Sequence, residues 1–132
     1  MTVDNKTITY WIDLSEYDIE VAESLFEKAH YIYVGFMCHQ GTEKMLKAVY
    51  VHKNNSLPPY IHRLDRLIEL AELKDKISEE KYDLIDELTP LNIQARYPIY
   101  KEAIHNLIDK EKPQEILSKT KELIQWLKTQ IN

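Results

Sequence analysis

Glycine occupies only two of the 132 positions of this chain, Gly35 and Gly41. β-Sandwiches and β-barrels need many tight turns, and glycine is the residue that such turns most often require. Phosphate-binding loops and dinucleotide fingerprints need glycines in clusters. The sequence therefore excludes an all-β fold and a glycine-rich nucleotide loop.

Apolar residues recur at helical spacing along almost the whole chain, in segments 14–29, 31–53, 64–71, 78–91 and 113–131. Asp13 or Ser15 is expected to cap the first helix, and Ser78 a later one. Two asparagines and two prolines break the pattern at 54–59, and residues 92–100 are expected to be irregular. The pattern predicts an all-α antiparallel up-and-down bundle of four main helices plus one or two short helices, in a single domain spanning residues 1–132.

The segment 31–53 is the longest and most apolar of these helices, so we expect it at the centre of the bundle. Gly41 lies inside it, although glycine costs about 1 kcal/mol relative to alanine in a helix interior. Close approach of a neighbouring helix is the simplest explanation. The single cysteine, Cys38, is expected to be a buried structural thiol.

Charge and composition limit the partners and cofactors that the chain can take. The formal net charge is −5, so binding to nucleic acid would need a local basic patch. One cysteine excludes an internal disulfide, and the five histidines contain no pair at zinc-binding helical spacing, so we expect neither a metal nor a cofactor. No secretory signal and no membrane-spanning apolar run is visible, which predicts a soluble, cytoplasmic protein.

Three polar groups are candidates for function. In the central helix, Glu43 and Lys47 are spaced to form an ion pair, and a solvated helix face explains them as well as a binding surface does. His62 and Arg63 follow the double proline, where they could hold a phosphate or have a capping role. Arginine is rare in this chain, so Arg96, in the triplet Arg96-Tyr97-Pro98, indicates bidentate pairing with a phosphate or an internal carboxylate.

The order of these motifs resembles the HEPN family of small helical bundles. In that family the central helix carries a Gln-x-x-Glu-Lys-x-x-Lys-Ala pattern, matched here by Gln40, Glu43, Lys44, Lys47 and Ala48. A Thr-His-Asp-Leu-like element opens the third helix, and here it reads Ile61-His62-Arg63-Leu64, with Arg63 in place of the acid. The later Arg-Tyr-Pro element is Arg96-Tyr97-Pro98, without the family's flanking threonine and aspartate.

The resemblance implies a dimerising helical bundle with a cleft for nucleotide or RNA, often encoded beside a nucleotidyltransferase-type partner. The nucleotide-binding residues expected here are His62, Arg63, Arg96, Tyr97, Lys44 and Lys47. Ribonucleases of the family pair an arginine with a histidine a few residues later, whereas eight residues separate Arg96 from His105 here. The wider spacing favours a non-catalytic module.

We therefore predict a module that binds nucleotide or RNA and a partner protein, as a homodimer and as half of a two-component toxin–antitoxin-like system. Tyr31, Tyr33, Tyr97 and Tyr100 lie near expected helix ends or loops, and aromatic residues there favour the dimer. The first alternative is a metal-independent ribonuclease in which Arg96 stabilises the phosphorane and His105 or His62 acts as general acid–base. The second is a structural bundle that binds no ligand.

Overall fold

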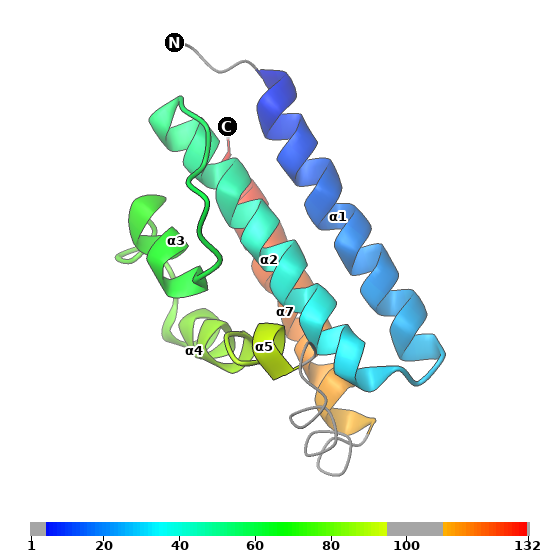
Figure 1. Cartoon of the computed structure of the whole chain (residues 1–132). Coiled ribbons are helices and arrows are strands. Elements are labelled where there is room, and N and C mark those ends of the chain that lie inside the picture. Colours follow the sequence, from blue (N-terminus) through cyan, green and yellow to red (C-terminus); the bar gives the residue numbers. More distant parts are fainter. Residues whose placement is uncertain (1–4, 95–109, 132) are drawn as a thin grey trace.

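The computed structural model describes residues 5–94 and 110–131, and these residues form helices and no strand (Figure 1). Helix α1 spans Asn5–Glu27, α2 spans Tyr31–Asn54 and α7 spans Glu111–Thr129. Within the described residues 55–94, three shorter helices follow α2: α3 at Leu64–Leu70, α4 at Glu79–Leu88 and α5 at Leu91–Gln94. The predicted all-α bundle of long helices with short ones is confirmed.

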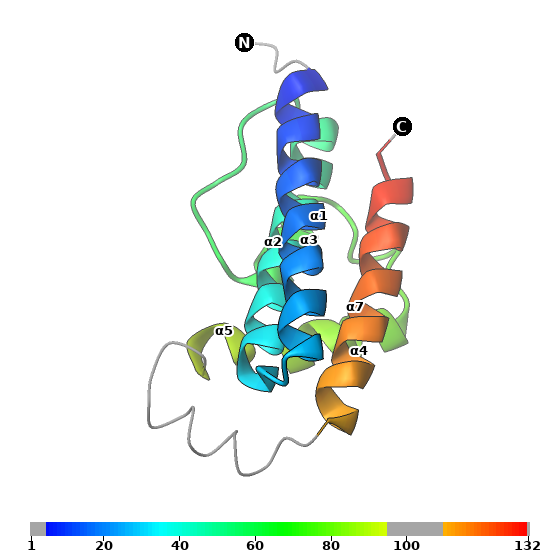
Figure 2. The same cartoon turned by 90° about the vertical axis from the view of Figure 1, so that its right-hand side faces the viewer.

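Helix α2 is the central element of the bundle, as the sequence predicted. It contacts every other described helix. α1 runs antiparallel to it, α7 lies along both in the direction of α2, and the short helices lie on the side of α2 away from α1 (Figures 1 and 2). Side chains on nearly all faces of α2 are buried or partly buried, so several of its polar residues lie in the interior of the bundle.

The start of the first helix differs from the prediction. α1 begins at Asn5 instead of near Leu14, so neither Asp13 nor Ser15 is its N-cap. Trp11 and Ile12 pack against the core, which extends the helix toward the amino terminus. Ser15 is fully buried, and its hydroxyl donates a 2.6 Å hydrogen bond to the carbonyl oxygen of Gly41 on α2.

The helix boundaries around the short helices follow local signals. α2 ends at Asn54, and Asn55 adopts the left-handed conformation (φ 50°) that often closes a helix. Ser78 caps α4 by accepting a 3.3 Å hydrogen bond from the Lys81 amide, as predicted. The expectation of irregular chain at 92–100 is wrong for residues 92–94, which belong to α5. Residues 95–100 lie outside the described part of the chain.

Candidate functional site

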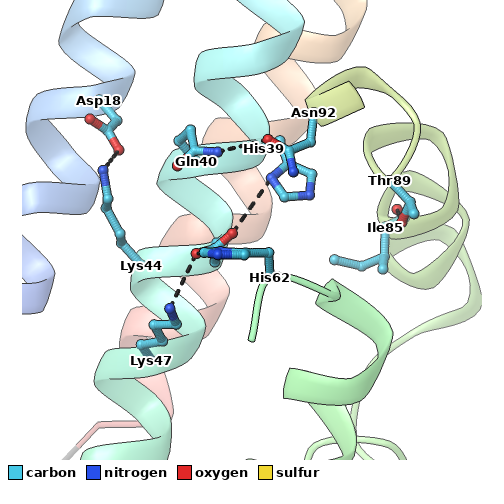
Figure 3. Close-up of polar contacts among 10 residues, drawn as sticks. Asp18, His39, Gln40, Lys44, Lys47, His62, Ile85, Thr89 and Asn92 are labelled. Atoms are coloured by element: carbon cyan, nitrogen blue, oxygen red, sulfur yellow. Dashed lines mark hydrogen bonds and ion pairs between the residues drawn. The ribbon is translucent and has the colours of Figure 1, made fainter. Parts of the chain in front are cut away.

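A buried carboxylate, Glu43, lies midway along α2 with nitrogen-bearing side chains around it. The residue is 3% exposed. Its Oε2 atom lies 3.2 Å from Nζ of Lys47 and 3.0 Å from Nδ1 of His62, and its Oε1 atom lies 3.9 Å from Nδ1 of His39. The cluster therefore joins α2 to the loop that precedes α3 (Figure 3).

Two features of the sequence assemble this cluster. His39, Glu43 and Lys47 are spaced by four residues, so they lie on one face of α2. Pro58 and Pro59 keep the chain extended after α2 ends, and the loop then passes back along the helix toward α3 (Figure 1). His62 thereby reaches Glu43 across 19 sequence positions.

The energetic reason for the cluster is the cost of burying a charge. A carboxylate taken out of water must be paired and hydrogen-bonded to be tolerated. Oε2 of Glu43 has two partners, whereas Oε1 has no hydrogen bond to any residue that the structure describes. Removing His62 or Lys47 would leave the carboxylate with less compensation, so the three residues form one unit.

His62 is the exposed member of the unit. Its side chain is 63% exposed, against 4% for that of Glu43. Nδ1 contacts the carboxylate, so Nε2 is the ring nitrogen left for another hydrogen bond. No residue in 5–94 or 110–131 bonds to Nε2. The ring is thus held in one orientation by a buried group while its other nitrogen is open to a ligand.

Lys44 and Lys47 lie beside the cluster but are bound to carboxylates. Nζ of Lys44 is 2.5 Å from Oδ2 of Asp18, a buried residue of α1. Lys47 pairs with Glu43, and its ammonium lies 5.5 Å from the centroid of the Trp11 ring, within cation–π range. The structure therefore brings Lys44, Lys47 and His62 together, and it gives both lysines internal partners.

Arg63 makes its ion pair outside this cluster. Its guanidinium binds both carboxylate oxygens of Asp65, at 2.8 and 3.3 Å, and its side chain is 74% exposed. The hydrogen bond to Arg63 lowers the pKa of Asp65, and Asp65 in turn raises the pKa of Arg63. Arg63 remains accessible from solvent, with its charge shared with that carboxylate.

The remaining predicted site residues, Arg96, Tyr97 and His105, lie outside the described residues. In the part of the chain that the structure describes, no group of three or more His, Cys, Asp or Glu side chains is placed to hold a metal ion. No helix in that part is long and apolar enough to cross a membrane.

Comparison with known families now adds to this geometry. The family model of the HEPN domain matches residues 8–130, almost the whole chain. The chain belongs to the HEPN domain family. No curated protein and no solved structure matches it. HEPN domains are generally related to nucleotides and RNA, and the family assignment supports that broad function for this chain.

The HEPN pattern on α2 corresponds to the contacts that the helix makes. Gln40 donates a 3.0 Å hydrogen bond to Asn92 of α5, Lys44 binds α1, and Glu43 binds His62. Ala48 is fully buried. The polar residues of the pattern are therefore the ones that join α2 to three other parts of this HEPN domain.

Sequence reasoning missed Asp18, Asn92 and the burial of Glu43. The Glu43–Lys47 pair was expected, but on a solvated face or a binding surface, whereas Lys47 is only 6% exposed. One signal was present in the sequence: the pair lies in the most apolar helix, where even the charged face has neighbours to contact. No such signal marks Asp18 or Asn92, because their partners Lys44 and Gln40 are distant in the sequence and come close only when the helices pack.

Proposed function

We propose that this HEPN domain binds a phosphate-bearing ligand, a nucleotide or RNA, at His62. The observation that carries the proposal is the pairing of an exposed imidazole with a buried carboxylate, His62 with Glu43, at 3.0 Å. Nδ1–H donates to the buried carboxylate, and in the protonated form of the ring Nε2–H donates as well, to a phosphate oxygen whose direction the carboxylate fixes. Arg63, one residue later and 74% exposed, adds a guanidinium.

Binding by this arrangement is electrostatic and local. The chain has a net charge of −5, so it gains no general attraction to a polyanion. Lys44 forms an ion pair with Asp18, and Lys47 forms one with Glu43. The proposed role of the two lysines is to hold the site in shape and to offset the negative charge of these carboxylates, which would otherwise repel the phosphate. Arg96 and Tyr97 complete the proposed site from the later segment of the chain.

The first experiment measures binding of ATP and of a single-stranded RNA about 12 nucleotides long by titration calorimetry. We expect His62→Ala to weaken binding about 10-fold or more, because a hydrogen bond to a charged group contributes about 1.5–3 kcal/mol. Glu43→Gln should weaken it less, since the glutamine keeps the shape of the side chain but loses its charge. Affinity should fall between about 50 and about 200 mM salt.

His30→Ala is the matched control, because His30 is an exposed histidine in the connection between α1 and α2. It should bind like the wild type. Equal affinity of His62→Ala and His30→Ala would contradict the assignment of His62, and no heat from either ligand with the wild type would contradict ligand binding itself. Thermal melting of each variant establishes that a loss of binding is not a loss of fold.

The proposal includes a partner protein. Membership of the HEPN family supports a role as half of a two-component toxin–antitoxin-like system with a nucleotidyltransferase-type protein. A neighbouring gene for a small nucleotidyltransferase is the first observation to seek. Co-purification of the two proteins at equal stoichiometry is the expected result, and separate elution of the two proteins would contradict the pairing.

A second candidate function is favoured by the same carboxylate–imidazole pair. A buried acid that orients an exposed histidine is an arrangement suited to general acid–base catalysis. In this metal-independent ribonuclease, Arg96 stabilises the charge on phosphorus and His62 or His105 transfers protons. EDTA-resistant RNA cleavage, reduced on the order of 100-fold by Arg96→Ala and by one histidine variant, would favour the enzyme over the binding module.

A further inference from the structure

The ring of Tyr60 is fully exposed, at 100%, in the loop between α2 and α3. It follows Pro58 and Pro59, and the amide of Ile61 donates a 2.9 Å hydrogen bond to the carbonyl oxygen of Pro59. That bond closes a three-residue turn with Tyr60 at its centre. The turn directs the aromatic ring outward, away from the fold.

The backbone on both sides of Tyr60 is held in place. The prolines fix their own φ angles on one side. On the other side, Ile61 packs against the core and His62 binds Glu43. An aromatic ring on a restrained backbone binds a ligand at little entropic cost, because few bonds remain to be ordered on binding.

The neighbours of Tyr60 define the kind of ligand that fits. His62 is two residues away, and two peptide units place its backbone on the order of 7 Å from that of Tyr60. Arg63, 74% exposed, follows directly. A bare aromatic face beside cationic side chains is the combination with which proteins bind single strands, the bases stacking on the ring while the phosphates contact the cations.

We propose that Tyr60 stacks on an unpaired base of single-stranded RNA whose adjacent phosphate contacts His62. This inference rests on the proposed function and names its ligand class. Duplex RNA is excluded from this mode, since its bases are stacked on one another and present no free face. Contact with a second copy of the chain would also cover Tyr60, but a nucleotide strand presents a phosphate beside every base, and this matches an aromatic ring with His62 and the Arg63 guanidinium close by in the chain.

The test uses an RNA strand about 12 nucleotides long with one 2-aminopurine base, and the same sequence as a duplex. Tyr60→Ala should weaken binding of the single strand about 10-fold and should abolish the quenching of 2-aminopurine that stacking causes. Tyr60→Phe keeps the ring and should retain both. Leu57→Ala removes an exposed apolar side chain, 69% exposed, from the same loop and should bind like the wild type.

The outcomes separate the two proposals. If His62→Ala loses RNA binding while Tyr60→Ala binds and quenches like the wild type, the stacking assignment is overturned and the proposed function stands. If the wild type binds ATP but no RNA, the stacking assignment alone is overturned; if it binds neither, the proposed function fails and the stacking assignment fails with it. Equal binding of single strand and duplex overturns the assignment, as does conversion of a dimer into monomers by Tyr60→Ala.

Discussion

The thiol of Cys38 is fully buried near Thr120 of α7, and burial raises its pKa to about 12. Thr120 and Lys121 act in the opposite direction and are the smaller causes. A thiol in this state is protonated at neutral pH, so it is neither a nucleophile nor a metal ligand there. The sequence interpretation of Cys38 as a buried structural thiol is confirmed.

We expect native protein to resist thiol reagents at about pH 8 and to react once it is unfolded. The unfolded thiol ionises near its ordinary pKa of 9.0, whereas the folded thiol stays protonated up to about 12. The folded state therefore holds more protons in this range, and its free energy of unfolding should fall as pH rises from about 9 toward 12. Cys38→Ala should lack this part of the pH dependence in denaturant titrations. Rapid, stoichiometric labelling of the native thiol would contradict the burial of Cys38.

Of the contacts of Glu43, one could be predicted from the sequence and another could not. Its pairing with Lys47 follows from helical spacing alone, and the structure confirms it at 3.2 Å. Its contact with His62 depends on a loop that returns along α2, and a periodicity argument contains no information about such a return. The residues His62, Glu43, Lys44 and Lys47 could thus be named from the sequence, but the burial of Glu43 and its contact with His62 could not.

At the scale of the elements, α1 and α2 pack tightly against each other at Gly41. A Cβ atom at this position would lie 2.9 Å from Cδ1 of Ile19 and 3.3 Å from the carbonyl oxygen of Ser15. The same site holds the hydrogen bond from Ser15 to Gly41. The prediction that Gly41 permits close approach of a helix is confirmed.

Gly41→Ala should lower the free energy of unfolding by about 1–2 kcal/mol, because overpacking outweighs the gain in helix propensity. Gly35→Ala is the matched control within α2. There a Cβ atom meets the end of the Leu91 side chain at 2.8 Å, with the next Leu91 atoms at 3.5 Å, and that side chain is partly exposed and can rotate away. We expect a change within about 0.5 kcal/mol for Gly35→Ala, measured by urea titration. Equal effects of the two variants would show that the α1 contact is not especially tight.

Most helices could be predicted because their signals are local. The break after Asn54, the Ser78 cap and Pro113 in the first turn of α7 all act within a few residues of themselves. The start of α1 depends instead on what Trp11 and Ser15 contact in other parts of the fold. Tertiary packing therefore decided the boundary that sequence reasoning missed.

For the whole molecule, assembly remains a prediction that the exposed aromatic residues support. Tyr10 and Tyr17 are seven residues apart on α1 and are 58% and 62% exposed, so they share one outward face. Tyr31, by contrast, packs against Phe26 with the ring centroids 5.6 Å apart. Tyr97 and Tyr100 lie outside the described residues.

We expect a homodimer of twice the 15.7 kDa chain mass in sedimentation equilibrium. Tyr17→Lys should shift it toward monomer, because a charge would have to be buried in the contact. Leu57→Ala, at an exposed position in the loop between α2 and α3, should leave the mass unchanged. A monomeric mass for the wild type at high protein concentration would disprove the dimer.

The bond between His62 and Glu43 also bears on the motion of the molecule. α1, α2 and α7 pack against one another, whereas the loop before α3 is held to the core by Ile61 and to α2 by this bond. The loop therefore forms a unit that can open locally without global unfolding. A ligand that needs His62 in place binds the closed population alone, so it must slow amide exchange in the loop by the factor 1 + [L]/Kd.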